Sequence, residues 1–258
     1  MPQRRHVIVD GTRLETLVYA VPRPSLPTIV LLHEALGSAR SWNRFAPRLA
    51  AATGRGVVAY SRQGAGSSDP LQQPRQRDYL QREAEAVLPA LLHACGIDRP
   101  ILFGHSDGAS IALVYAGAFP SHTGALILEA PHVFVEQITL AGIEHAARDF
   151  HHGELRAKLA RYHDDVDSVF AAWHDLWLDP AFRAWNIEEY LSSIRCPVLV
   201  IQGDLDQYGT VAQADAIARR VHPCDLLVLP DCGHVPHRER ADETLSASVR
   251  FLAATAAP

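Results

Sequence analysis

The chain has 258 residues, of which 48% are hydrophobic and 21% charged, and its formal net charge is −5 at pH 7. This length and balance are typical of one large α/β domain, or of a core with an insertion, that buries a full-sized core. The negative charge and the scattered basic residues argue against a nucleic-acid partner or an anionic membrane surface.

No stretch contains the roughly 18 continuous apolar residues of a membrane-spanning helix, and the first residues lack the apolar centre of a signal peptide. The four cysteines show no C-x-x-C spacing. We therefore favour free thiols in a reducing cytoplasm; a Cys224–Cys232 bridge is the alternative, and it requires an oxidising compartment. The 14 histidines are dispersed without an H-E-x-x-H motif, so no metal is expected.

The chain opens with alternating apolar and polar residues over 6–20, interrupted by Asp10-Gly11. An Asp-Gly pair in this context predicts a hairpin of two antiparallel strands. Short apolar runs then alternate with helical patterns, and we expect each run to be a buried strand: residues 28–33, 57–61, 101–103, 125–129, 196–202 and 225–229. The helical patterns cover a segment with Trp42, Phe45 and Leu49 on one face, then 78–94, the segment after Ser106, 210–221 and 239–254. The fold class is therefore α/β, a mostly parallel sheet of about eight strands with helices on both faces.

Residues 131–195 break this alternation. They contain no clear strand, and they carry three of the four tryptophans (Trp173, Trp177 and Trp185). A structureless loop of this length is improbable inside a compact domain. We therefore predict a core domain formed by residues 1–130 and 196–258, with a helical lid inserted at 131–195.

A serine stands at the centre of the most informative stretch, 101–118. The apolar run 101–103 leads into Gly104-His105-Ser106-Asp107-Gly108, and a pattern of small residues follows. Strand, sharp turn and helix around G-x-S-x-G are typical of a nucleophile elbow, in which flanking side chains would collide with neighbouring backbone. The helix that begins here directs its free N–H groups and positive end toward the serine.

A serine hydroxyl needs a base to take its proton, and the base needs a third group to orient it. Two later strands end in residues of these types: 196–202 is followed by Asp204 and Asp206, and 225–229 is followed by His234. Because catalytic groups of open parallel sheets gather at the carboxyl ends of strands, we expect these side chains near Ser106. The chain order Ser, Asp, His is the one expected with such an elbow.

The sequence resembles the α/β-hydrolase superfamily over nearly its whole length. The matching motifs stand at residues 33–35 (HEA), 64–69 (GAGSSD), 104–108 (GHSDG), 203–206 (GDLD) and 233–239 (GHVPHRE). The resemblance implies that Ser106 is the nucleophile, His234 the general base and Asp206 the acid that orients it. It places the oxyanion hole at the backbone N–H groups of Ala35 and Asp107, and it requires no cofactor.

Other residues compete for these roles. Asp204 competes with Asp206, and the family spacing favours Asp206. Glu129 ends a strand where some relatives carry their acid. His237 is expected to pack or hydrogen-bond at a helix start, and Cys232 is a nucleophile only if Ser106 is not.

Glu34 departs from the His-Gly of most relatives. Its carboxylate faces inward, toward the oxyanion or a second functional group, or it points to solvent, or it pairs with an arginine such as Arg62. We favour the pairing. The Asp107 side chain is expected to turn away or pair locally.

These features predict a hydrolase that acts on a small molecule, first of all a small or medium carboxylic ester. Glu34, Phe134, Trp173, Trp177 and Tyr208 are the candidate substrate-binding residues, in an apolar pocket beneath the lid. The alternatives are a carbon–carbon bond hydrolase of ring-cleavage products, a lactonase, a thioesterase or a perhydrolase. The first is suggested by Cys232-Gly233-His234, which resembles the motif near the catalytic histidine of that group. A small-ligand receptor on the same fold is the non-enzymatic alternative. The sequence does not distinguish a monomer from a homodimer.

Overall fold

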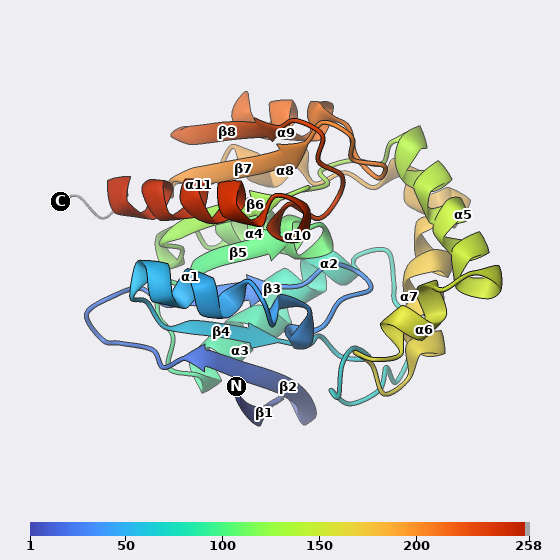
Figure 1. The fold of residues 1–258 in the computed structure, drawn as a ribbon, viewed down its shortest axis with the longest axis horizontal. Coiled ribbons are helices and arrows are strands. Elements are labelled where there is room, and N and C mark those ends of the chain that lie inside the picture. Colours follow the sequence, from blue (N-terminus) through green and yellow to red (C-terminus); the bar gives the residue numbers. More distant parts are fainter. Residues whose placement is uncertain (256–258) are drawn as a thin grey trace.

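The computed structural model describes residues 1–255 and contains one eight-stranded sheet in the order β1-β2-β4-β3-β5-β6-β7-β8 (Figure 1). β2 is antiparallel to both β1 and β4, and all other neighbours are parallel. The predicted fold class is therefore confirmed. The strands are β1 (Gln3–Val9), β2 (Thr12–Ala20), β3 (Ile29–Leu32), β4 (Val57–Tyr60), β5 (Ile101–His105), β6 (Ala125–Glu129), β7 (Val198–Gly203) and β8 (Cys224–Leu229).

Helices cover both faces of the sheet. Side chains of α1 and α11 pack in one apolar cluster, and those of α2, α3, α4 and α9 pack in the other. The helical elements before β6 are η1 (Ala39–Trp42), α1 (Ala46–Thr53), α2 (Tyr79–Arg82), η2 (Glu83–Val87), α3 (Leu88–Ala94), α4 (Asp107–Ala118) and η3 (Pro120–His122). Those after β6 are α5 (Gln137–His152), α6 (Leu155–Leu159), α7 (Val166–Trp177), η4 (Pro180–Ala184), α8 (Glu188–Leu191), α9 (Val211–Ala218), α10 (Pro236–Glu239) and α11 (Ala241–Ala254).

The opening hairpin forms where Asp10-Gly11 predicts it. Val9 is paired with Thr12, and both turn residues have positive φ, 47° for Asp10 and 79° for Gly11. These angles match a two-residue type I′ turn, whose twist suits antiparallel strands.

Three local predictions need correction. The single helix expected around Trp42, Phe45 and Leu49 is two elements, η1 and α1, although all three side chains are buried together. The helix expected over 78–94 contains a π-helical segment, η2, just before Pro89, which has no N–H to donate. The helix expected to begin at 239 begins at 241, after the separate turn α10.

β8 was expected to be a buried strand, and that expectation is wrong. Leu226 and Val228 are 38% and 40% exposed. β8 pairs only with β7 and forms one edge of the sheet, so its apolar side chains are not covered as those of the central strands are.

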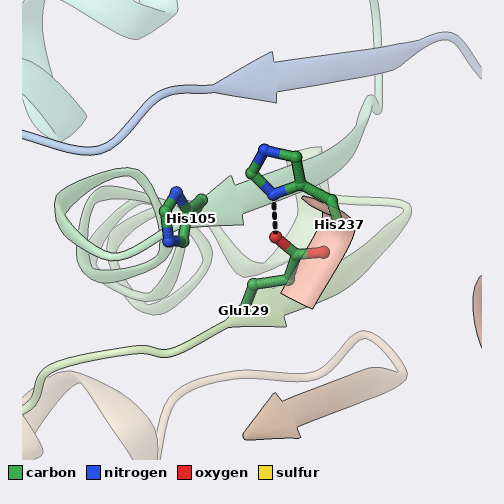
Figure 2. A group of neighbouring side chains, drawn as sticks. All are labelled: His105, Glu129 and His237. Carbon is green, nitrogen blue, oxygen red and sulfur yellow. Dashed lines mark hydrogen bonds and ion pairs between the residues drawn. The ribbon is translucent and has the colours of Figure 1, made fainter. Parts of the chain in front are cut away.

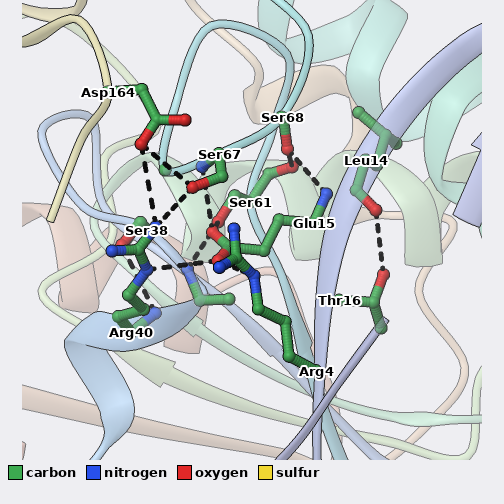
Figure 3. Close-up of polar contacts among 12 residues, drawn as sticks. Arg4, Leu14, Glu15, Thr16, Ser38, Arg40, Ser61, Ser67, Ser68 and Asp164 are labelled. Atoms are coloured by element: carbon green, nitrogen blue, oxygen red, sulfur yellow. Dashed lines mark hydrogen bonds and ion pairs between the residues drawn. The ribbon is translucent and has the colours of Figure 1, made fainter. Parts of the chain in front are cut away.

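A buried carboxylate on β2 joins the strand to two loops. Glu15 is fully buried, and it accepts hydrogen bonds from Arg40 Nε at 3.1 Å, Ser61 Oγ at 2.9 Å and the backbone N–H of Ser67 at 3.1 Å (Figure 3). Ser67 Oγ in turn donates to Asp164 at 3.0 Å. The network therefore links the sheet to the loop after β4 and to the helical segment between β6 and β7.

That segment contains α5 to α8, and Figure 1 shows α5, α6 and α7 together at one end of the sheet. Its aromatic residues pack mainly on each other: the Phe150 and Phe170 rings stack 3.9 Å apart, and Trp185 stacks on Phe182 at 5.6 Å. Much of the aromatic content of this segment therefore forms its own core.

Candidate active site

Ser106 lies at a strained turn between β5 and α4. Its φ of 53° and ψ of −117° are unfavourable for a residue with a Cβ, and such strain concentrates at functional sites. The flanking glycines make the turn sterically feasible. A Cβ at Gly104 would lie 2.3 Å from the Gly108 carbonyl oxygen, and a Cβ at Gly108 would lie 2.0 Å from that of Leu32.

His234, in the loop after β8, is held by Asp206, in the loop after β7. The His234 Nδ1 lies 2.9 Å from both carboxylate oxygens of Asp206. Asp206 also accepts hydrogen bonds from the Gln202 side chain at 2.9 Å and the Tyr208 N–H at 2.8 Å. These contacts orient the imidazole with its Nδ1 toward the acid and its Nε2 free.

The contact between Asp206 and His234 shifts the pKa of both side chains. Burial lowers the pKa of His234, but the charge and hydrogen bond of Asp206 outweigh burial and raise that pKa above its ordinary value of 6.5. Burial opposes ionisation of Asp206, yet His234 and the Tyr208 N–H hold the pKa of the carboxyl below 3.8. His132, beside His234, behaves differently: burial and the nearby His234 lower its pKa to about 4.

Ser106 and His234 line one cavity of about 60 Å³, to which α5 and α7 also contribute side chains. In the described part of the chain no hydrogen bond joins the Ser106 hydroxyl to the His234 ring. Catalytic hydrogen bonds are often long in ligand-free structures and shorten when substrate binds. The cavity thus brings together Ser106, the oriented His234 imidazole, Asp107 at the N-terminus of α4 and Ala35 in the loop after β3.

Arg62 fixes the loop that carries Ala35. Its guanidinium donates to the carbonyl oxygens of His33 at 2.6 Å and Glu34 at 3.0 Å, and it lies 3.5 Å from the Asp107 carboxylate. Tyr79 donates to the same carboxylate at 2.7 Å. Asp107 therefore pairs locally, and its charge is compensated within the protein.

The expected Glu34–Arg62 pair is wrong. Arg62 uses the backbone oxygen of Glu34, because Asp107 is the carboxylate in its reach. The Glu34 carboxylate accepts the Leu36 N–H at 3.1 Å and faces the cavity. Among the described residues no lysine or arginine forms an ion pair with it.

The cavity contains four of the five expected substrate-binding residues: Glu34, Trp173, Trp177 and Tyr208. Phe134 does not line it; this residue pairs through its backbone with Asn186 and packs on the core. Sequence reasoning missed His132, Thr139 and Ile143, which also line the cavity. His132 comes three residues after β6, and its position after a strand end was the available signal.

Two of the competing residues, Glu129 and His237, form a second buried group together with His105 (Figure 2). Glu129 accepts from His237 Nδ1 at 2.6 Å, not from His234, and His105 Nε2 donates to the His234 carbonyl oxygen at 2.7 Å. Asp204 accepts the Cys232 N–H at 3.4 Å. All four cysteines are unpaired, so the alternative Cys224–Cys232 bridge is absent.

The same group has a set of side chains able to hold a metal ion. The ligand atoms of His105, Glu129 and His237 lie within 4.8 Å of one another, and all three residues are buried. In this structure, however, two of the ring nitrogens already form hydrogen bonds. His105 Nε2 donates to the His234 carbonyl oxygen, and His237 Nδ1 donates to Glu129. These hydrogen bonds connect β5 to the His234 loop and α10 to the end of β6.

Comparison with known proteins supports the fold and gives the family. Residues 29–247 match the model of the alpha/beta hydrolase family. The chain is 26% identical to the serine hydrolase BPHL of Mus musculus, over 94% of this chain and 88% of that protein. It is 23% identical to the 2-hydroxy-6-oxo-6-phenylhexa-2,4-dienoate hydrolase of Burkholderia cepacia, over 87% of each. A crystal structure of a membrane phospholipase A superposes with a TM-score of 0.82 at 24% identity, over 98% of this chain and 86% of that one.

The chain belongs to the alpha/beta hydrolase family. Its relatives in that family are hydrolases of more than one bond type, so membership establishes a hydrolase and leaves the bond open. Within residues 1–255, no helix is long and apolar enough to cross a membrane.

The ion pair between Arg62 and Asp107 leads to a prediction about the stability of the fold. Asp107→Asn removes the one carboxylate that forms an ion pair with the buried Arg62 guanidinium among the described residues, and we expect the free energy of unfolding to fall by about 3 kcal/mol. Urea denaturation measures the loss. The matched control is Asp167→Asn, which removes the carboxylate of the exposed Arg156–Asp167 pair and should change stability little. Equal losses in the two variants would contradict the role given to Arg62.

Proposed function

We propose that this protein is a serine esterase that cleaves small carboxylic esters through an acyl-enzyme. The observation that supports it most directly is the Asp206–His234 pair, with Nδ1 at 2.9 Å from the carboxylate, on the same cavity as a serine at a strained elbow. In this proposal Ser106 is the nucleophile, His234 the general base and Asp206 the orienting acid.

The chemistry follows from the positions of these groups. Ser106 Oγ attacks the ester carbonyl carbon while His234 Nε2 takes the hydroxyl proton, and the imidazolium is stabilised by Asp206. The backbone N–H groups of Ala35 and Asp107 stabilise the oxyanion, the latter aided by the positive end of α4. The protonated imidazole then gives its proton to the departing alcohol, and water repeats the sequence on the acyl-enzyme to release the acid.

The size and lining of the cavity favour a small, apolar acyl group. About 60 Å³ is small beside the roughly 300–1,000 Å³ of drug-sized ligand sites. Trp173 and Trp177 on α7 and Ile143 on α5 supply the apolar walls. We therefore infer that residues 131–195 act as a lid, and that longer acyl chains require α5 and α7 to move.

Charge favours esters over ring-cleavage products as substrates. No arginine or lysine lines the cavity, and the Glu34 carboxylate faces it without a cationic partner. A dienoate substrate, such as the one in the name of the Burkholderia relative, carries a carboxylate that Glu34 would repel. A neutral ester, or one with an ammonium group, suits this site better.

The four unpaired cysteines fit the cytoplasm as the compartment.

The nucleophile is tested by covalent labelling. A fluorophosphonate probe should modify Ser106, as shown by peptide mapping, and Ser106→Ala should abolish both labelling and hydrolysis of p-nitrophenyl butyrate, by on the order of 10⁶-fold in kcat. Ser110→Ala, one turn along the same helix, is the matched control and should keep labelling. Labelling that persists in Ser106→Ala, or a protein that binds esters without turnover, would overturn the proposal in favour of another nucleophile or a receptor.

The pH profile tests the base. Because hydrolysis needs neutral His234, kcat/KM should rise with pH through a midpoint above 6.5, the ordinary histidine value that Asp206 raises. Asp206→Asn removes the charge but not the burial, so the midpoint should fall below that of the wild type and kcat should drop by about 10⁴-fold. Asp204→Asn, in the same loop, should keep the wild-type midpoint. Identical midpoints in Asp206→Asn and the wild type would refute the pairing as the cause.

Glu34 is tested with esters of different charge. We compare KM for a neutral ester, one with an ammonium group and one with a carboxylate, all with acyl groups of similar size. The wild type should prefer the ammonium ester to the carboxylate ester by about 10- to 100-fold, and Glu34→Gln should remove most of this difference, because the amide keeps the Leu36 bond without the charge. Glu144→Gln, exposed on α5, should not alter it. A carboxylate preference in the wild type would instead favour the carbon–carbon bond hydrolase.

A further inference from the structure

A second and larger cavity, of about 660 Å³, lies between the core and the helical segment. Its walls come from η1 and α1, from the turn after α6, and from α10 and the start of α11. It shares no lining residue with the cavity that contains Ser106 and His234. It is therefore a separate site, reached without passing the proposed catalytic groups.

Four arginines line this cavity: Arg44, Arg48, Arg161 and Arg238. None of its lining residues is acidic, although the whole chain carries a net charge of −5. The lining of this cavity is therefore positively charged, whereas the chain as a whole is negatively charged. Such a cluster raises the local concentration of anions.

Three of the four guanidiniums have no carboxylate partner among the described residues. Arg161 donates to the Lys158 carbonyl oxygen at 3.4 Å, Arg238 donates to that of Ser41 at 3.3 Å, and Arg44 forms no ion pair. Arg48 is the exception, since it pairs with Asp242. Most of the donor capacity of the cluster is therefore free for a ligand.

A buried histidine adds a second kind of evidence. His237 is 4% exposed and lines the cavity, and its Nε2 has no hydrogen-bond partner. Its Nδ1 donates to Glu129, and Figure 2 shows the second ring nitrogen on the opposite side of the ring from that carboxylate. The Trp42 ring, 4.5 Å away, fixes the imidazole in place. A buried nitrogen without a partner is costly and points to a missing ligand or water.

We propose that this cavity binds a phosphate-bearing small molecule distinct from the ester substrate. Planar guanidinium groups match phosphate oxygens in pairs, and several arginines around one cavity suit a group with two negative charges better than a single carboxylate. The monohydrogen form of phosphate has both an acceptor and an O–H donor. It can therefore hydrogen-bond His237 Nε2 in either protonation state of that nitrogen, once a side-chain shift uncovers it.

Calorimetric titration with inorganic pyrophosphate, at constant ionic strength, tests the site. The wild type should bind one equivalent with a dissociation constant below about 1 mM, and more tightly than it binds citrate, a tricarboxylate of similar charge. Arg44→Glu and Arg161→Glu should each weaken pyrophosphate binding by about tenfold or more, because each replaces a donor by a repelling charge. Arg250→Glu, exposed on α11 and outside the cavity, is the matched control for the change in net charge.

Circular dichroism and the thermal midpoint establish that each variant is folded, so a loss of binding is not a loss of structure. His237→Gln offers a second measurement, since its amide also places a polar group toward the cavity and should retain part of the affinity. Saturable binding that Arg44→Glu and Arg161→Glu reduce and Arg250→Glu retains supports the site. The proposal is overturned if the wild type shows no saturable pyrophosphate binding, if citrate binds as tightly, or if all three arginine variants bind pyrophosphate alike.

Discussion

The hydrogen bond between the Asp206 carboxylate and His234 Nδ1 is the interaction on which the rest of the site depends. It orients the imidazole only because the Asp206 carboxylate is itself held in place. The Gln202 side chain and the Tyr208 N–H, at the end of β7 and in the loop after it, both donate hydrogen bonds to that carboxylate. It also requires that the loop after β8 stay in register. The side chain of His105, one residue before Ser106, hydrogen-bonds the His234 carbonyl oxygen, so this side chain connects the elbow to the loop that carries His234.

Much of this architecture could be predicted from the sequence, because its signals are local. Runs of β-branched residues indicated the central strands, Asp10-Gly11 indicated the hairpin, and the glycines around Ser106 indicated the elbow. Strand ends in a parallel sheet meet at one edge, and this rule predicts that His234 and either Asp204 or Asp206 lie near Ser106. The resemblance to the α/β-hydrolase superfamily favours Asp206. The same rule, applied to β6, would also have identified His132.

What could not be predicted depends on competition between partners. Arg62 lies within reach of a loop with one carboxylate and a helix start with another, and only the three-dimensional arrangement shows that Asp107 takes the ion pair. Phe134 illustrates the same limit: an aromatic residue in the helical segment suits either a pocket or a core, and the packing decides for the core. The exposure of β8 also depends on strand order, which no single strand sequence reveals.

The backbone of Ser106 has a consequence for how this protein can change. Its φ of 53° costs of the order of 1–3 kcal/mol, which glycine at that position would not incur. Serine at this position therefore makes the folded chain less stable than glycine would. While Ser106 is retained, gains in heat tolerance must come from other parts of the chain, such as surfaces and loops remote from the elbow.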